Sequence, residues 1–225
     1  MHVKRASEHF DVYQINPVKV SRRDGINYVF NGQHTMEIVA TVSGGRDTPV
    51  WCMVYDDLIY THEADIFANQ QKYVKALTAY EIFMANIEAG SDKQLLIKGL
   101  VESYNLSLSP IRKQGCICAV SALEYIYDKF GYEVLSRTLR LVIGAWEGNE
   151  LSFGASILKG IAKVLVAFDT EINDEVFIDK LGNVSVKEII RTARDRRGGP
   201  MGYAEAVLLV YNKKMHNQLL MEKIK

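Results

Sequence analysis

The sequence is short of several features that would place it in a specialised class. Only three cysteines occur in 225 residues, and this odd number argues against a disulfide framework. Basic and acidic residues balance at 27 each, so the chain lacks the overall positive charge of a dedicated nucleic-acid binder. No apolar run approaches the roughly 20 residues that a membrane-spanning helix needs, and the N-terminus lacks the apolar core of a signal peptide. We therefore predict a cytoplasmic protein without a membrane segment.

Familiar catalytic motifs are missing as well. The sequence contains no Gly-x-Ser-x-Gly elbow, no phosphate-binding loop of the Gly-x-x-x-x-Gly-Lys type and no conspicuous pair of carboxylates. Cys116 and Cys118 have no second cysteine pair beside them, and His62 and Glu63 have no third partner at metal-ligand spacing. We predict no catalytic residue and no metal site, and we expect both cysteines to be small buried residues.

The first sixty residues carry the signals of a small sheet. Pro17 to Ser21 alternates with period two, Arg23-Asp-Gly25 is a turn, and Ile26 to Phe30 is typical of the partner strand. His34 to Val42 predicts a short helix, which the Gly-Gly pair after it ends. The apolar run from Val50 to Tyr55 has the length of a further strand.

Beyond Thr61 the apolar residues follow the helical period. Thr78 and Glu81 have the spacing of a capping box, and further helices are expected almost to the C-terminus. The predicted fold class is α+β, with a few-stranded sheet and short helices at residues 1–78 and an all-helical domain at residues 79–225.

The most informative local feature is the junction between the second strand and the first predicted helix, Asn31-Gly-Gln-His-Thr35. Gly32 permits a tight turn and a close approach of the backbone to a ligand. The amides that follow lie at a helix N-terminus, which favours an anion such as phosphate, and His34 adds a side-chain donor. The alternative is a plain Asn-Gly turn with a surface histidine.

The stretch from Asn16 to His34, with its Arg-Asp-Gly turn and its Asn-Gly-Gln-His box, resembles the opening of ParB-like domains. At a suitable distance follows Ala68-Asn69-Gln-Gln-Lys72, where the ParB superfamily typically has Glu-Asn-x-x-Arg. The resemblance covers roughly residues 10–78. The whole chain is also similar to a ParB-like family of phages and mobile elements in which a helical region follows the domain.

This resemblance to the ParB/sulfiredoxin-like superfamily implies a site. In ParB-type members the glycine-led box holds the phosphates of a nucleotide, and the matching residues are Asn31, Gly32, Gln33, His34 and Thr35. Sulfiredoxins have a reactive cysteine where Gln33 stands, so their thiol chemistry is not expected. Thr35 replaces the usual arginine, and with it a bidentate phosphate clamp.

The second box implies two supporting residues, Asn69 and Lys72, with lysine in place of arginine. Ala68 stands where a metal-holding acid is expected, and Glu63 or Asp65 would have to substitute for it. The implied ligand is a nucleoside triphosphate with Mg²⁺, bound without turnover.

Two segments are candidates for contact with DNA. Leu95 to Pro110 permits a helix-turn-helix reading, although Pro110 would leave the second helix short. The densest basic cluster comprises Arg191, Arg194, Arg196 and Arg197. It suits phosphate contacts, but cations at a solvated helix end are the ordinary explanation for such a cluster.

Typical ParB-like domains have a strand and a helix before the position of residue 10. Either the chain begins inside the domain or its sheet is naturally small, and an exposed sheet edge would favour a homodimer. Three functions remain open: a ParB-like phosphate- or nucleotide-binding module in a phage or plasmid DNA process with a DNA or protein partner, a structural or interaction protein with a degenerate site, and a ParB-like nuclease or NTPase.

Overall fold

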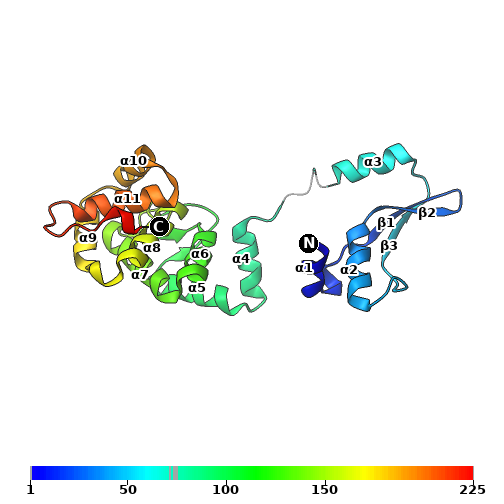
Figure 1. Cartoon of the computed structure of the whole chain (residues 1–225), viewed down its shortest axis with the longest axis horizontal. Helices are drawn as coiled ribbons and strands as arrows, with labels where there is room; N and C mark the ends of the chain where they lie inside the picture. The colour runs from blue at the N-terminus through cyan, green and yellow to red at the C-terminus, as the bar shows by residue number, and fades with distance from the viewer. Residues whose placement is uncertain (1, 71, 73–75, 225) are drawn as a thin grey trace. The chain divides into compact units, whose positions relative to one another are not determined.

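The computed structural model describes residues 2–70, 72 and 76–224 (Figure 1). The chain divides into two compact units, Met1–Ala76 and Leu77–Lys225, whereas the sequence pattern placed the change after residue 78. The first unit holds a small sheet and the second is mainly helical, so the predicted α+β class is confirmed. Within the described residues, no helix has both the length and the apolar character required to cross a membrane.

The N-terminal unit follows the predicted order of strand, strand, helix and strand. Its elements are α1 (His2–Glu8), the 3-10 helix η1 (Val12–Gln14), β1 (Val18–Arg23), β2 (Ile26–Asn31), α2 (Gln33–Ser43), β3 (Cys52–Tyr55) and α3 (Tyr60–Asn69). The helix α1, which packs against α2, was not predicted. It lies before residue 10, where typical ParB-like domains have a strand and a helix.

The hairpin of β1 and β2 is fixed by its turn. Asp24 and Gly25 both have positive φ, 51° and 76°, as the two central residues of a type I′ turn require. The antiparallel pairing runs from Arg23 opposite Ile26, but it shifts between Lys19 and Val20. This β-bulge lies immediately before the Asn-Gly box, and bulges are common beside functional sites. β3 then pairs parallel to β1, which gives the strand order β2-β1-β3.

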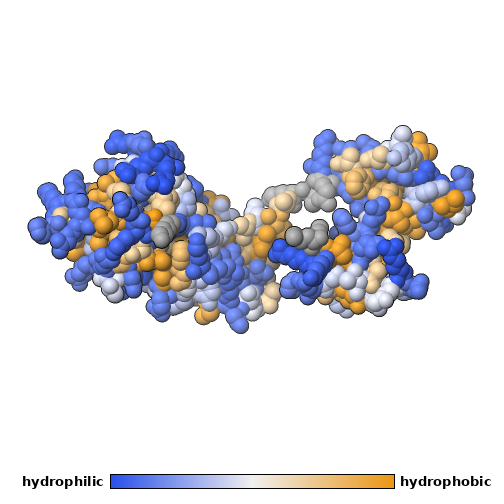
Figure 2. Space-filling model, viewed as in Figure 1, coloured by the Kyte–Doolittle hydropathy of each residue, from blue (hydrophilic) through white to orange (hydrophobic). Residues whose placement is uncertain are grey.

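The core of the N-terminal unit is small. Val18 and Val20 of β1 and Val39 of α2 are the buried apolar side chains among its described residues. β3 is an edge strand, and the residue before it, Trp51, is 78% exposed. Figure 2 accordingly shows orange, hydrophobic areas on the surface of this unit. The predicted homodimer through a sheet edge stays a prediction.

The C-terminal unit is a bundle of helices with one small exception. Its elements are α4 (Ala79–Glu88), α5 (Asp92–Ser103), β4 (Ser107–Leu108), β5 (Cys116–Ile117), α6 (Val120–Phe130), α7 (Tyr132–Trp146), α8 (Ala155–Phe168), η2 (Asp169–Glu171), α9 (Asp174–Gly182), α10 (Val186–Arg196), α11 (Gly199–Asn212) and η3 (Met221–Lys223). The capping box at the start of α4 is confirmed, because Thr78 accepts from the Glu81 amide and Glu81 from the Thr78 amide.

The prediction of an all-helical C-terminal domain was wrong at residues 107–117. Ser107 and Leu108 pair parallel with Cys116 and Ile117, where the alternation of leucine and serine signals a strand rather than a helix. Ile117 is completely buried, so its side chain anchors this short ladder in the core. The helix-turn-helix interpretation of residues 95–110 is therefore wrong as well.

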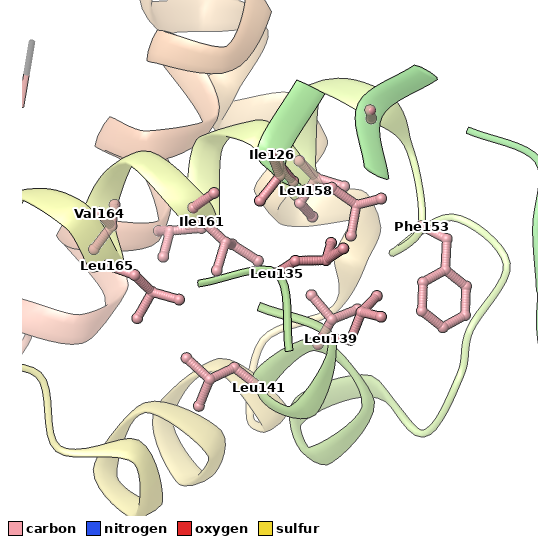
Figure 3. Close-up of a cluster of buried hydrophobic side chains, with 14 of the residues drawn as sticks. Ile126, Leu135, Leu139, Leu141, Phe153, Leu158, Ile161, Val164 and Leu165 are labelled. Carbon is pink, nitrogen blue, oxygen red and sulfur yellow. The ribbon is translucent and has the colours of Figure 1, made fainter. Parts of the chain in front are cut away.

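The core of the C-terminal unit lies where α6, α7 and α8 meet (Figure 3). Ile126 of α6, Leu135 and Leu139 of α7 and Leu158 and Ile161 of α8 are all completely buried. Each residue comes from the apolar stripe of its helix, which is the pattern that the helical period of the sequence predicts.

Two glycines allow α11 to pack unusually close to its neighbours. A Cβ on Gly160 of α8 would lie 2.7 Å from the Cβ of Tyr203 and 2.9 Å from the amide nitrogen of Ala204. A Cβ on Gly202 of α11 would lie 2.5 Å from the carbonyl oxygen of Ala193 in α10. Since these neighbours are mainly backbone atoms, they cannot rotate away, and both positions require glycine.

We expect Gly160→Ala to destabilise the C-terminal unit by about 1–3 kcal/mol, because the added methyl overpacks the contact with α11. Gly99 in the middle of α5 is the matched control, since a Cβ there meets nothing within 4 Å. Gly99→Ala should stabilise by about 0.5–1 kcal/mol through its higher helix propensity. Urea denaturation measures both changes, and equal effects would contradict the close packing of α8 on α11.

Candidate functional site

The Asn-Gly box forms the N-terminus of α2. Gly32 is the N-cap residue, with φ 98° and ψ 12°, and no side chain among the described residues caps the helix. Gln33, His34 and Thr35 form the first turn, and the Gly32 carbonyl accepts the Met36 amide at 3.0 Å. The amides of a first turn have no partner within their own helix, and the helix dipole adds partial positive charge there. The junction thus meets the electrostatic requirement for holding an anion.

Gly32 also has a structural reason to be glycine. A Cβ on this residue would lie 2.9 Å from the Cα of Val18 in β1, closer than a side chain can approach a backbone atom. The left-handed backbone adds strain for any other residue. Hence Gly32 presses the turn onto β1 and fixes where α2 begins.

An open hollow of about 350 Å³ lies at this helix terminus. It is lined by Phe30, Asn31, Gly32, Gln33, His34, Thr35 and Phe67. All five residues of the first predicted box therefore line one hollow, together with two aromatic rings. The volume is at the small end of the roughly 300–1,000 Å³ that ligand sites occupy.

The two aromatic rings come from different elements. Phe67 lies on α3 and is 59% exposed, and Phe30 lies on β2 at a centroid distance of 5.9 Å from the ring of Tyr55. Neither Phe30 nor Phe67 was expected at the site from the sequence. A signal was available for Phe30, which directly precedes the box, but Phe67 reaches the hollow only through the packing of α3.

Gln70, which follows α3, binds the residue that precedes the glycine of the box. Its Oε1 accepts from Nδ2 of Asn31 at 2.7 Å and from Nζ of Lys19 at 3.2 Å. The hydrogen bond fixes the Asn31 amide and ties α3 to β1 and β2. Gln70 and Lys19 were not predicted, although Gln70 lies next to the residue that the resemblance selected.

The second predicted box does not line the hollow. Asn69 turns back along α3, where its Nδ2 donates to Oδ1 of Asp65 at 2.8 Å and to the Asp65 carbonyl at 3.1 Å. Lys72 has an exposed side chain, and its backbone amide donates to the Asn69 carbonyl at 2.9 Å. These two residues therefore support the end of α3 rather than the wall of the hollow.

The carboxylates that an enzyme would need here have other partners. Glu63 is buried and forms a salt bridge with Arg23, whose Nε lies 3.0 Å from Oε1 of Glu63. Glu37 pairs with Arg46 at 2.7 Å, and Asp65 accepts from Asn69. No group of three or more histidine, cysteine, aspartate or glutamate side chains suited to a metal ion occurs in the described part of the chain. Of these three acids, Asp65 lies beside Asn69, and the nuclease or NTPase alternative stays a prediction.

The four arginines of the basic cluster separate into two pairs. Nε of Arg196 lies 2.6 Å from Oε2 of Glu205, and an Nη of Arg197 lies 2.5 Å from its Oε1. Glu205 is only 6% exposed, so these two arginines neutralise a buried carboxylate and join α10 to α11. Arg191 and Arg194 are exposed on α10.

The two cysteines of the Cys-x-Cys pair do not form a reactive site. Cys116 is buried in β5 with its sulfur 3.0 Å from the Ser107 hydroxyl, whereas Cys118 is half-buried. Burial raises the pKa of the Cys118 thiol, although Arg112 lowers it in part. A raised pKa leaves the thiol protonated near neutral pH and therefore a poor nucleophile.

Comparison with known proteins places the chain in a family. The sequence model of a family of unknown function, DUF6551, matches residues 1–223. The chain belongs to this family. No curated protein and no solved structure matches the sequence. For this member of DUF6551 the geometry of the hollow is therefore the main guide to function.

The Arg23–Glu63 pair provides a test of how α3 is held beside the hollow. We expect Arg23→Met to destabilise the N-terminal unit by about 1–3 kcal/mol, because it leaves the buried carboxylate of Glu63 without its cation. Replacing both partners, with Arg23→Met and Glu63→Leu, should restore most of this loss, since no buried charge then remains. Chemical denaturation of the single and double variants measures the coupling. Additive losses in the double variant would show that the pair does not hold α3.

Proposed function

We propose that the N-terminal unit is a ParB-like module that binds a phosphate group at the first turn of α2. The observation that carries the proposal is the open hollow at a helix N-terminus whose N-cap residue is a glycine. Anions bind at such termini because the first-turn amides and the helix dipole both favour negative charge. Asn31, His34 and Thr35 add side chains that can donate hydrogen bonds from the wall.

The two phenylalanines favour a nucleotide over a bare phosphate. Phe30 and Phe67 line the same hollow as the helix terminus, so one ligand can place its phosphate on the amides and its base against a ring. Stacking of a base on an aromatic side chain is worth about 1–3 kcal/mol and tolerates any base. A nucleoside triphosphate with Mg²⁺ is accordingly the ligand to try first.

Binding without hydrolysis is the expected outcome of this chemistry. Thr35 cannot supply the bidentate clamp of an arginine, and Glu37, Glu63 and Asp65 all have partners of their own. We infer that the bound nucleotide acts as a signal or a cargo in a phage or plasmid DNA process. The requirement for glycine at position 32 against Val18 favours one second candidate, a structural or interaction module in which the hollow holds no ligand.

Gln33→Glu tests the phosphate site without threatening the fold. The change is isosteric, and a carboxylate in the first turn of a helix is itself favourable to the helix. It should nevertheless repel a phosphate from the hollow. Asn27→Asp, at the far end of β2, adds the same charge as a control.

The measurement is the thermal stability of the full chain with each NTP and Mg²⁺. A ligand present at 100 times its Kd should stabilise the wild type and the control by about 2.7 kcal/mol. Gln33→Glu should abolish the shift while its melting temperature without ligand stays at or above that of the wild type. If no nucleotide shifts the wild type, or if Gln33→Glu retains the full shift, the phosphate site is refuted and the structural candidate is preferred.

Phe67→Ala tests whether the base of the nucleotide contributes to the binding affinity. Because Phe67 is 59% exposed, its removal should cost the unit little stability. We expect the Kd for the nucleotide to rise by about 5- to 100-fold, corresponding to the loss of one stacked base. Calorimetry with the nucleotide and with inorganic triphosphate separates the two parts of the ligand. An equal loss of affinity for both would indicate that Phe67 shapes the hollow rather than stacking on a base.

A further inference from the structure

The helix α10 is the second member of a helix pair joined by a short turn. The three residues Asn183, Val184 and Ser185 separate α9 from α10, and the Ser185 hydroxyl accepts the Glu188 amide at 3.2 Å as the N-cap. Both helices pack on α11, and α10 lies at the outside of the C-terminal unit (Figure 1). The outer side of α10 is thus left open to a partner.

One side of α10 is apolar and the other is charged. Val186, Ile189 and Ala193 are buried. Lys187, Arg191 and Arg194 are exposed, with the spacing i, i+4, i+7 that places them in one strip roughly 60° wide. We refer to these three residues as the α10 cation strip. The top of the unit, where α10 lies, is blue and therefore hydrophilic in Figure 2.

The cations of this strip differ from the other arginines of α10 in their partners. None of the three forms an ion pair with a described residue, whereas Arg196 and Arg197 both bind Glu205. Glu188 and Asp195 are also exposed on α10 and lie at i−3 and i+4 from Arg191, so they flank one side of the strip and offset part of its charge. The positive charge of the α10 cation strip is thus directed at the solvent.

The dimensions of the strip suit the backbone of a duplex. Lys187 and Arg194 are seven positions apart, a span of roughly 10 Å along the helix. A strip of this length can reach neighbouring phosphates of a duplex, one for each cation. The strip also lines an open hollow of about 450 Å³ with Ile190 and Asp195, which leaves its charged groups accessible.

We propose that α10 contacts double-stranded DNA through Lys187, Arg191 and Arg194, and that Arg196 and Arg197 take no part because they neutralise Glu205. The proposal does not depend on a ligand in the hollow of the N-terminal unit. It concerns affinity rather than sequence selection, because contacts to phosphates position a protein on DNA without reading the bases.

The test compares the binding of a fluorescent duplex by three forms of the full chain. The strip variant carries Lys187→Gln, Arg191→Gln and Arg194→Gln. The control variant removes the same charge from three other exposed cations, with Arg112→Gln, Lys113→Gln and Lys213→Gln. Since all six side chains are exposed, both variants should melt within a few degrees of the wild type, and circular dichroism checks this.

We expect the strip variant to bind at least about tenfold more weakly at 0.1 M salt, and the slope of log K against log salt to fall by about 2.7, the value for three lost phosphate contacts. The control variant should keep the slope of the wild type. Equal losses in the two variants, or no binding of duplex by the wild type at low salt, would overturn the proposal. Tighter binding of single-stranded DNA, RNA or anionic vesicles than of the duplex would overturn it too.

Discussion

The contact between Gly32 and Val18 determines the geometry of the N-terminal unit. The chain turns from β2 into α2 with its backbone pressed against β1, at a distance that no residue with a Cβ could reach. This contact sets the residue at which α2 begins and therefore where the amides of its first turn lie. The hollow, its polar wall and the anion-favouring field of the helix all follow from that position. One glycine thus serves both the fold and the candidate site.

The second wall of the hollow depends on polar contacts rather than on an apolar core. α3 is attached to the sheet near its start by Glu63 and Arg23, and after its end by Gln70 with Asn31 and Lys19. With so few buried apolar side chains in the unit, these attachments are a large part of what holds Phe67 over the hollow.

The C-terminal unit, in contrast, is held together mainly by a large apolar core. Its helices meet through completely buried leucines and isoleucines, and Gly160 and Gly202 bring three of them into close contact. Glu205 then engages two of the four arginines of the basic cluster. The positive charge of Arg191 and Arg194, on the outer side of α10, is not engaged by Glu205. A rigid base of this kind suits a recognition surface, since little order is lost when the surface binds.

The sequence by itself determined the order of the elements from β1 to β3 and the residue types of the first box. The Asp-Gly turn fixed the hairpin, the Thr78–Glu81 spacing fixed the start of α4, and Asn31 to Thr35 marked a strand-to-helix junction, because turns, caps and helix starts are encoded within a few neighbouring residues. Contacts between residues that are far apart in the sequence were not predicted. Only the tertiary structure decided that Gln70 rather than Asn69 meets Asn31, that Phe67 reaches the hollow, that residues 107–117 form a ladder and that Glu205 separates Arg196 and Arg197 from Arg191 and Arg194. Each of these depends on partners that lie eight or more positions away. The periodicity of a sequence does not report which distant side chains will face each other.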